Sequence, residues 1–405
     1  MKLPRTHLLI LVSMCSLLAA IIGLLTNVQG LFFTPIAEEL GVLKGEVSLT
    51  ITIASVCSGI GGIFAPRLFK LVKMRVLTAI MCMVICAATA ASGICHSIMP
   101  LYLLSAVRGF ASGITGMVFA TTILNNWFEA NIGLVTSIAV GCSGISGSVF
   151  SLLMSGVIQA SGWRAAYVVA AAIVALLMLP AVLFVPTLTP QESGLLPHGA
   201  QEPLYVEAST KAQANAMPIH AGLFALVFLY AVFSHGPAGI SQHMPGLAES
   251  VGLGAGVGAA MLSASMVTNT VGKIAFGALS DAWGARRTII IFCAVASSAL
   301  VALMLAHTPG ISVVASAAYG FTFATNTVGI TMLTRDVFGV VNYSRVYPIV
   351  VFGASLAYSA LTAAYGFMYD FTGSYILPLI VALAMAVAAV VVSQLAYALG
   401  ARGDA

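Results

Sequence analysis

Residues 8–36 read LLILVSMCSLLAAIIGLLTNVQGLFFTPI and contain no charged side chain. At 1.5 Å per residue, a helix of this length crosses about 30 Å of hydrocarbon. Lys2 and Arg5 precede the run, as in a signal peptide, but the run is too long for a signal-peptide core. Eleven similar stretches follow, so we interpret residues 8–36 as a retained first membrane helix.

The composition indicates that most of the chain lies in lipid. The 405 residues are 60% hydrophobic and 7% charged, whereas soluble domains average about 25% charged residues. Lipid requires every backbone polar group to be paired within the protein, and long apolar runs favour helices over a barrel. We predict helices at 8–36, 47–66, 74–96, 99–121, 131–159, 164–186, 219–245, 257–279, 286–306, 310–334, 345–369 and 374–399.

The predicted fold is an all-α membrane protein with twelve transmembrane helices in two parallel six-helix repeats. Similar residues recur at an offset of about 211 positions, such as Gly61 with Gly272 and Arg75 with Arg286. A polar, proline-containing segment at 187–218 suits a linker. The expected domains are therefore an N-terminal bundle at 1–186 and a C-terminal bundle at 219–405. Parallel repeats of this kind place a substrate site near the midplane.

The distribution of Lys and Arg predicts that both termini are cytoplasmic. With that orientation, twelve basic residues lie on the cytoplasmic side and two, Lys44 and Arg164, lie outside. The cytoplasmic set is Lys2, Arg5, Arg67, Lys70, Lys73, Arg75, Lys211, Arg286, Arg287, Arg335, Arg345 and Arg402. The expected location is the inner (plasma) membrane, as a multi-pass protein and a monomer. The net charge of +4 is not a nucleic-acid footprint.

The loop between the eighth and ninth predicted helices reads Gly277-Ala-Leu-Ser-Asp281-Ala-Trp-Gly284-Ala-Arg286-Arg287. This resembles the signature of the major facilitator superfamily, Gly-x-Leu-x-Asp-x-x-Gly-x-Arg-Arg. The segments Arg108–Gly116 and Gly162–Tyr167 resemble further motifs of that superfamily. The resemblance covers essentially the whole chain and implies a secondary transporter. We interpret Asp281, Arg286 and Arg287, with Arg75 in the first half, as a conformational latch.

A narrower resemblance is to the monocarboxylate porter and oxalate/formate antiporter families. It rests on Asn126-Trp127-Phe128 with Gly141-Cys-Ser-Gly144, on Asp370–Tyr375 and on Gly194–Gly199. In those families a substrate-binding arginine precedes a glycine by four positions, and Lys273 has that place before Gly277. The chain departs from the pattern at Asn27, which stands where a lysine is usual in animal porters, and at Ala130 and Asn131, where basic residues are usual.

Two basic residues, Arg108 and Lys273, fall inside predicted helices. A lone charge at membrane depth costs about 2.5–3.5 kcal/mol, so it needs a partner or a function. Asn269 lies one turn before Lys273 on the same helix face. We predict that Lys273, Arg108 and Asn269 bind substrate, with Asn27, Gln29 and Asn326 as further polar candidates. The alternatives are a snorkelling lysine, a structural arginine, and amides that bond neighbouring helices.

Carboxylates are confined to predicted helix ends and loops: Glu38, Glu39, Glu46, Glu129, Glu192, Glu202, Glu207, Glu249, Asp281, Asp336, Asp370 and Asp404. No countercharge for Arg108 or Lys273 is evident, which favours a small organic anion, most simply a monocarboxylate. The candidates are lactate, pyruvate, formate and oxalate-like anions. Protons or a counter-transported anion are the expected coupling partners. His235, before Gly236-Pro237, is the candidate proton carrier, with a structural histidine at the proline kink as the alternative.

Other functions remain open at this stage. An exporter of amphipathic drug-like compounds is one, and a transporter-like sensor that binds without translocating is another. No nucleophile–base pair, metal ligand set or ATP-binding motif is evident, so we expect neither an enzyme nor a cofactor. The seven cysteines are interpreted as small buried hydrophobic residues.

Overall fold

The structure is a computed structural model that describes residues 4–129, 132–185, 187–199 and 220–403. The chain divides into two compact units, Met1–Leu204 and Tyr205–Ala405. Residues 200–218 of the predicted linker, Lys211 among them, lie outside the described residues, as does Lys2. Each unit consists of helices joined by turns and loops, and its described residues contain no strand apart from one isolated β-bridge in the first unit.

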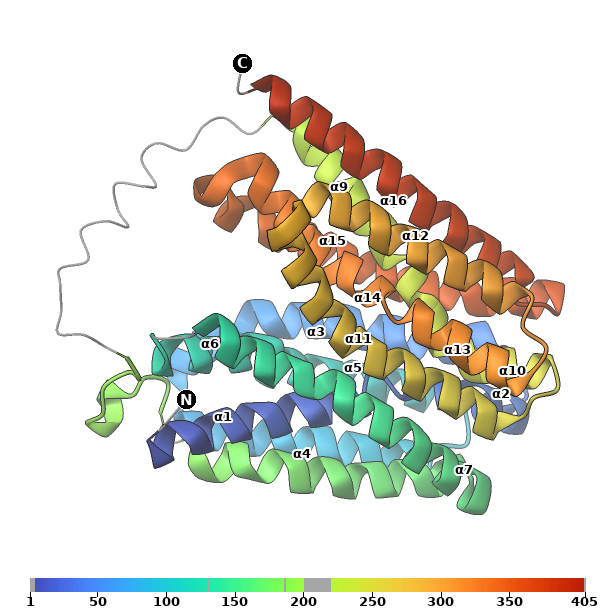
Figure 1. Ribbon diagram of the computed structural model, residues 1–405. Helices are drawn as coiled ribbons and strands as arrows, with labels where there is room; N and C mark the ends of the chain where they lie inside the picture. Colours follow the sequence, from blue (N-terminus) through green and yellow to red (C-terminus); the bar gives the residue numbers. More distant parts are fainter. Residues whose placement is uncertain (1–3, 130–131, 186, 200–219, 404–405) are drawn as a thin grey trace. The chain divides into compact units, whose positions relative to one another are not determined.

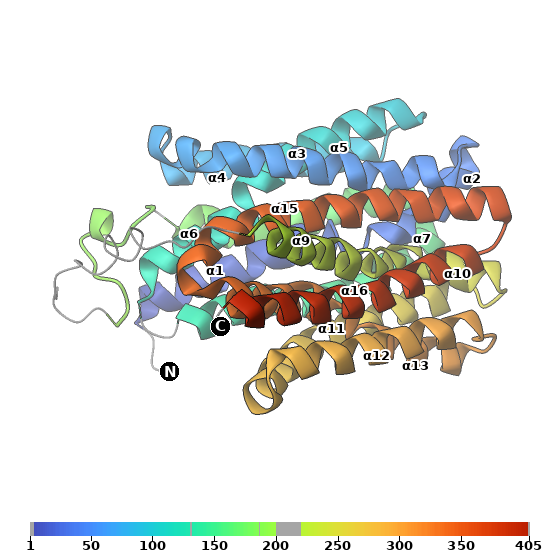
Figure 2. The ribbon, with the colours of Figure 1, turned by 90° about the horizontal axis from the view of Figure 1, so that it is seen from above.

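The first unit contains six helical segments in its described part (Figures 1 and 2). Its elements are α1 (Arg5–Leu18), the π-helix η1 (Ala19–Leu24), the 3₁₀ helix η2 (Gln29–Phe32) and α2 (Phe33–Leu40), then α3 (Lys44–Leu71), α4 (Met74–Ser92), α5 (Ile98–Thr115), α6 (Met117–Trp127), α7 (Ile132–Phe184) and η3 (Gln191–Ser193). The elements α1 to α2 form one broken segment, and so do α5 and α6. Figure 2 shows α3 lying beside α5, the two helices that carry the closest packing of this unit.

The second unit repeats this plan in the residues that the structure describes. Its elements are α9 (Ala221–His235), η4 (Pro237–His243, 3₁₀) and α10 (Met244–Ser250), then α11 (Ala255–Trp283), α12 (Ala285–Met304), α13 (Pro309–Tyr319), α14 (Thr322–Ala324), η5 (Thr325–Gly329, π), α15 (Ile330–Thr372) and α16 (Ile376–Gly403). Both ribbon views show α12 beside α13 (Figures 1 and 2).

Two of these helices, α7 and α15, each join two predicted helices. The joints are Gly162, with φ 78° and ψ 169°, and Gly339, with φ 66° and ψ 172°. Only glycine adopts such backbone angles at little cost, so the chain can change direction there in a single residue. Figure 1 shows α7 reversing its course at this joint. The predicted helices 131–159 and 164–186 are the two arms of α7.

Nine helices of the described residues are long and apolar enough to cross a membrane. One of the nine, Leu134–Phe184, holds both arms of α7. Helix α11 is not among them although it has 29 residues, because polar residues such as Asn269 and Lys273 dilute its apolar content. The segment from α13 to Phe338 is also absent from the nine, because breaks at α14 and η5 interrupt it.

Four predicted helices are not continuous, and the prediction was wrong on that point. The break in 8–36 is at η1 and η2, that in 99–121 is at Gly116, that in 219–245 is at η4, and that in 310–334 is at α14 and η5. Hydropathy does not reveal such breaks, because a 3₁₀ or π turn keeps the same apolar residues in the membrane. Pro237, which lacks an N–H group, is a local cause at η4.

The closest helix contacts within the first unit recur within the second unit, at positions that are 211 residues later. A Cβ atom added to Gly109 would lie 2.2 Å from the carbonyl oxygen of Ala54 on α3. At the equivalent place in the second unit, a Cβ added to Gly320 would lie 2.3 Å from the carbonyl oxygen of Ser265. Both pairs are related by 211 residues. Glycine is therefore required in each unit for the backbones to approach.

The reciprocal contact also repeats. A Cβ added to Gly61 would lie 2.2 Å from the carbonyl oxygen of Phe110, and one added to Gly272 would lie 2.9 Å from the Phe321 ring. The partners Phe110 and Phe321 are again 211 residues apart. The sequence repeat thus corresponds to a repeat of packing.

A third repeated contact involves two of the predicted latch arginines. The Arg75 side chain donates a hydrogen bond from Nη2 to the Leu183 carbonyl oxygen, at 3.1 Å. The Arg286 side chain donates from Nε to Oε1 of Gln394, at 2.6 Å. Leu183 and Gln394 are also 211 residues apart. Each arginine therefore ties the third segment of its unit to the sixth.

The start of the predicted linker packs on the first unit. The Asn126 side chain donates to the Leu188 carbonyl oxygen at 3.1 Å, and His198 forms a β-bridge with Phe128. The imidazole of His7, on α1, lies 3.2 Å from the Leu196 carbonyl oxygen and contacts the Trp127 ring at a centroid distance of 5.7 Å. Residues 187–199 are thus held against α1 and α6.

The packing of α5 on α3 predicts a specific sensitivity to a single methyl group. We expect Gly109→Ala to destabilise the protein by about 1–3 kcal/mol, because the clash is with backbone atoms of Ala54 that cannot rotate away. Gly156→Ala is the matched control, since a Cβ at Gly156 meets nothing within 4 Å. Thermal unfolding in detergent compares the two, and equal stability of both variants would contradict the close approach.

Candidate functional site

A buried arginine lies at the centre of the first unit. Arg108 is carried by α5, and its side chain is 5% exposed. Its Nη2 group donates a hydrogen bond to Oε1 of Gln29 at 3.1 Å. Gly113 lies further along the same helix and lets α5 approach α3 closely. A Cβ atom added to Gly113 would lie 2.0 Å from the Ser58 carbonyl oxygen. The close packing of α5 on α3 thus buries the Arg108 guanidinium beside the neutral amide of Gln29.

Gln29 is placed by the break in the first membrane segment. It is the first residue of η2, and its side chain is buried. Its Nε2 group donates to Oγ1 of Thr50 at 3.4 Å, and Thr50 in turn donates to the Val47 carbonyl oxygen at 2.7 Å. These partners set the orientation of the amide, so that its oxygen is the atom that faces Arg108.

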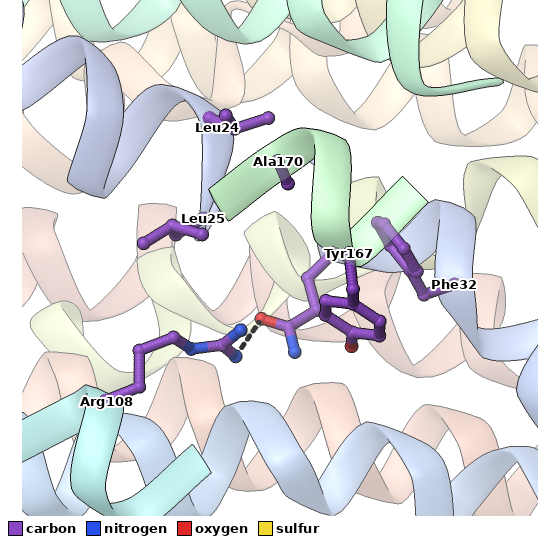
Figure 3. A pocket seen from close by; sticks show the side chains of 7 residues that line it. Leu24, Leu25, Phe32, Arg108, Tyr167 and Ala170 are labelled. Carbon is purple, nitrogen blue, oxygen red and sulfur yellow. Dashed lines mark hydrogen bonds between the residues drawn. The ribbon is translucent and has the colours of Figure 1, made fainter. Parts of the chain in front are cut away.

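A narrow pocket opens beside this pair (Figure 3). It has an empty volume of about 260 Å³, including the open solvent at its mouth. Its lining residues come from η1, η2, α5 and the second arm of α7: Leu24, Leu25, Gln29, Phe32, Arg108, Tyr167 and Ala170. The Arg108 guanidinium donates to the Gln29 amide oxygen, and Figure 3 shows the Tyr167 ring near the end of the Arg108 side chain. The pocket combines a cationic donor with apolar walls.

Tyr167 was not predicted as a site residue. Its side chain is 6% exposed, and its ring packs against the Phe32 ring at a centroid distance of 4.5 Å. The motif Gly162–Tyr167 was noted in the sequence only as a family resemblance. No spacing rule links Tyr167 to Arg108, because they meet only through packing of α7 on the other helices. Thr50 was missed for the same reason.

The second unit has a tyrosine where the first has Arg108. Tyr319 is 211 residues after Arg108, and it also contacts the broken segment of its unit. Its hydroxyl donates to the Pro237 carbonyl oxygen at 2.6 Å and accepts from the Ser241 N–H at 3.2 Å. A neutral phenol thus closes the helix break in the second unit. The positive charge of Arg108 is not needed for that structural role.

Lys273 is the basic residue at depth in the second unit. It lies on α11, and it forms no hydrogen bond or ion pair with another residue that the structure describes. The equivalent position in the first unit is Gly62. At each of these two positions, that of Arg108 and that of Lys273, one unit has a basic side chain and the other has a neutral residue.

Asn269 lies one helical turn before Lys273 and is 5% exposed. Its Nδ2 group points to the Met266 sulfur at 3.9 Å, and its Oδ1 atom has no hydrogen-bond partner among the described residues. Asn326, in the π-helix η5, is 4% exposed, and its Oδ1 atom likewise has no described partner. The two amides and Lys273 all belong to the second unit.

The other predicted polar residues differ in their surroundings. Asn27 donates from Nδ2 to the Ser143 carbonyl oxygen at 3.2 Å, so it joins the first segment to α7. His235 is the last residue of α9, and its Nδ1 atom is buried without a described partner. The interhelical alternative thus fits Asn27 well.

The predicted latch residues of the second unit differ in their contacts. Arg286 contacts α16 through Gln394, and its guanidinium lies over the Tyr397 ring at 5.9 Å. Asp281 and Arg287 are exposed, and no ion pair or hydrogen bond is described for either. Among the residues that the structure describes, no group of three or more His, Cys, Asp or Glu side chains could hold a metal ion.

The family model described as Major Facilitator Superfamily matches residues 15–262 and 238–399. No match was found among curated proteins. Three solved structures share the fold at low identity. A bacterial homologue of the human lysosomal transporter Spinster, in an inward-facing and occupied conformation, is 14% identical with a TM-score of 0.69, covering 99% of this chain and 98% of that one.

The other two structures are a D-xylose–proton symporter and a nucleoside transporter. The symporter is 13% identical with a TM-score of 0.73, covering 96% of each chain. The nucleoside transporter is 14% identical with a TM-score of 0.66, covering 97% of this chain and 99% of that one. Identities this low show the fold alone, whereas the family model spans most of the chain. The chain belongs to the major facilitator superfamily of secondary transporters.

Proposed function

We propose that this transporter moves a small organic anion, a monocarboxylate, by alternating access. The observation that carries the proposal is that Arg108 is buried against a neutral amide rather than a carboxylate. Lys273, in the other unit, also has no acidic partner among the described residues. Both termini are proposed to face the cytoplasm, on the Lys/Arg distribution.

The cost of an unanswered charge supports an anionic cargo. Removing a guanidinium or ammonium from water costs several kcal/mol unless an opposite charge or several hydrogen bonds compensate it. The described side-chain hydrogen-bond partners of Arg108 are Gln29 and Tyr167, and both are neutral groups. A carboxylate would accept charge-assisted hydrogen bonds from a guanidinium and cancel its charge. The cargo is thus the missing counterion.

The comparison between the two units supports a ligand role over a structural one. Tyr319 performs the bonding at the helix break without a charge, and Gly62 occupies the place of Lys273. If either charge served only to pack the helices, the other unit would need it too. The charges of Arg108 and Lys273 are therefore assigned to ligand binding rather than to helix packing.

The pocket size supports a small cargo. The pocket beside Arg108 is narrow and leaves no room for a drug-sized compound. The narrower resemblance to monocarboxylate porters, with Lys273 at the place of their substrate-binding arginine, agrees with a small carboxylate. His235 is the proposed proton carrier, because its buried Nδ1 atom has no described partner.

Lys273 provides the first test of this proposal. In proteoliposomes, we expect saturable uptake of radiolabelled small monocarboxylates, and we expect Lys273→Met to abolish it. Methionine keeps the length of the side chain but removes the charge that attracts the carboxylate. Unaltered uptake by Lys273→Met, in protein with normal thermal stability, would remove Lys273 from the site.

Arg108 is tested by binding. We expect Arg108→Gln to weaken carboxylate binding at least about 10-fold, the loss typical of one charge-assisted hydrogen bond. Arg67→Gln is the matched control, since Arg67 is an exposed arginine of the same unit. Ligand-induced thermal shifts compare the variants, and equal shifts for both would show that the buried guanidinium takes no part in binding.

The role of His235 is tested by the pH dependence of transport. An inward proton gradient should accelerate uptake by the wild-type protein, because histidine is the side chain best suited to exchange a proton near neutral pH. His235→Asn should remove this acceleration but leave exchange of internal for external carboxylate intact. A proton-driven uptake that survives in His235→Asn would exclude the histidine as the carrier.

A further inference from the structure

Two aromatic rings form one wall of the pocket beside Arg108. Phe32 and Tyr167 both line this pocket, and their rings pack against each other at a centroid distance of 4.5 Å. Both side chains are 6% exposed, and Figure 3 shows them next to each other. The wall therefore joins the first membrane segment, through η2, to the second arm of α7.

The local backbone places each ring in the pocket together with a second lining residue. In the 3₁₀ helix η2, Gln29 and Phe32 are three residues apart, and side chains at this spacing in a 3₁₀ helix lie on one face. On α7, Tyr167 and Ala170 are also three residues apart, and such pairs are neighbours on the surface of an α-helix. All four line the pocket. The break in the first segment thus orients both the amide and the ring.

Tyr167 connects the charged end of the pocket to its apolar wall. Its hydroxyl is hydrogen-bonded to the Arg108 side chain, and its ring packs on Phe32. Tyrosine suits this place because it combines an apolar ring with a polar tip. The carbon chain of a carboxylate that pairs with Arg108 would lie along the remaining lining side chains, which are apolar apart from Gln29: Leu24, Leu25, Phe32 and Ala170.

The aromatic wall is supported from behind. The Trp163 ring packs edge-to-face on the Tyr167 ring at a centroid distance of 6.1 Å, and Trp163 is 2% exposed. The indole N–H of Trp163 donates to the Glu39 carboxylate, which also pairs with Arg164. A ring enclosed in this way cannot move aside without disturbing close-packed neighbours. The wall is therefore a fixed boundary of the pocket.

We infer that the Phe32–Tyr167 ring pair limits the chain length of the cargo, which is a short-chain carboxylate with an apolar tail. The inference rests on the proposed transport of a carboxylate that pairs with Arg108. Burying one methylene group tightens binding about 4-fold where there is room for it. Forcing a methylene group against close-packed side chains weakens binding instead. Affinity should therefore rise with chain length only until the tail reaches the two rings.

A series of straight-chain acids tests the inference: acetate, propionate, butyrate and hexanoate. Their binding to the purified full-length protein is measured by calorimetry. For the wild-type protein, we expect propionate or butyrate to bind most tightly and hexanoate to bind at least about 5-fold more weakly, the effect of overpacking a close-packed site.

Two variants should shift this profile in opposite directions. Phe32→Leu removes part of the wall and should reduce the penalty for hexanoate about 4-fold, as expected for room for one further methylene group. Ala170→Val adds bulk to the lining and should make butyrate bind more weakly than acetate. The Ala170 variant tests the limit independently if Phe32→Leu does not fold.

Phe69→Leu is the matched control. Phe69 is a buried phenylalanine of the same unit, 7% exposed, whose ring contacts Phe119 at a centroid distance of 5.8 Å and which does not line the pocket. This variant should lose stability as Phe32→Leu does but keep the wild-type order of the four acids. A change of that order in the control would attribute the limit to general loosening of the unit and overturn the inference.

The outcomes separate this inference from the proposed function. Hexanoate that binds wild-type protein as tightly as propionate would overturn the length limit and leave carboxylate transport standing. A wild-type order of affinities in both Phe32→Leu and Ala170→Val, in protein of normal thermal stability, would do the same. No binding of any of the four acids to the wild-type protein would overturn both proposals.

Discussion

The proposed function depends on the hydrogen bond between the Arg108 guanidinium and the Gln29 amide, which is 3.1 Å long. It exists because two unrelated local features meet. The first membrane segment breaks at η2, which turns Gln29 inward, and glycines on α5 let Arg108 approach. Arg108 has no acidic partner among the described residues, and a charge in a low-dielectric environment interacts strongly with any anion that enters.

The internal repeat shows which contacts serve the fold. Contacts that recur at the same offset, such as Gly109 with Ala54 and Arg75 with Leu183, have partners in the second unit and are structural. Among the positions at which the two units differ are Arg108, which corresponds to Tyr319, and Lys273, which corresponds to Gly62. The two units thus have the same fold but place their basic side chains at different positions. We infer that these side chains bind one asymmetric cargo rather than stabilise the fold.

Much of the fold could be predicted from the sequence. Apolar run length gave the helical segments, and the offset of 211 residues paired Gly61 with Gly272 before their contacts were known. Arg108 and Lys273 could also be identified from the sequence, because charged residues are rare inside membrane helices. The helix breaks were not predictable from hydropathy, because the change from α to 3₁₀ or π geometry alters hydrogen bonding and leaves composition unchanged.

The candidate site could be predicted only in part. Tyr167 and Thr50 were missed because their roles arise from packing between segments far apart in sequence. Asn27 was placed among the ligand candidates, whereas it donates to the Ser143 carbonyl oxygen. Composition can show that a polar residue is buried, but only the fold shows whether a neighbouring helix already satisfies it.

The central claim is that the cargo is recognised as the counterion of a buried positive charge. Comparing the binding of lactate with that of lactamide by calorimetry tests it most directly, since the two have the same shape and differ in charge. The account predicts that lactate binds and that lactamide shows no measurable heat at the same concentrations. Equal affinity for the neutral amide would contradict it.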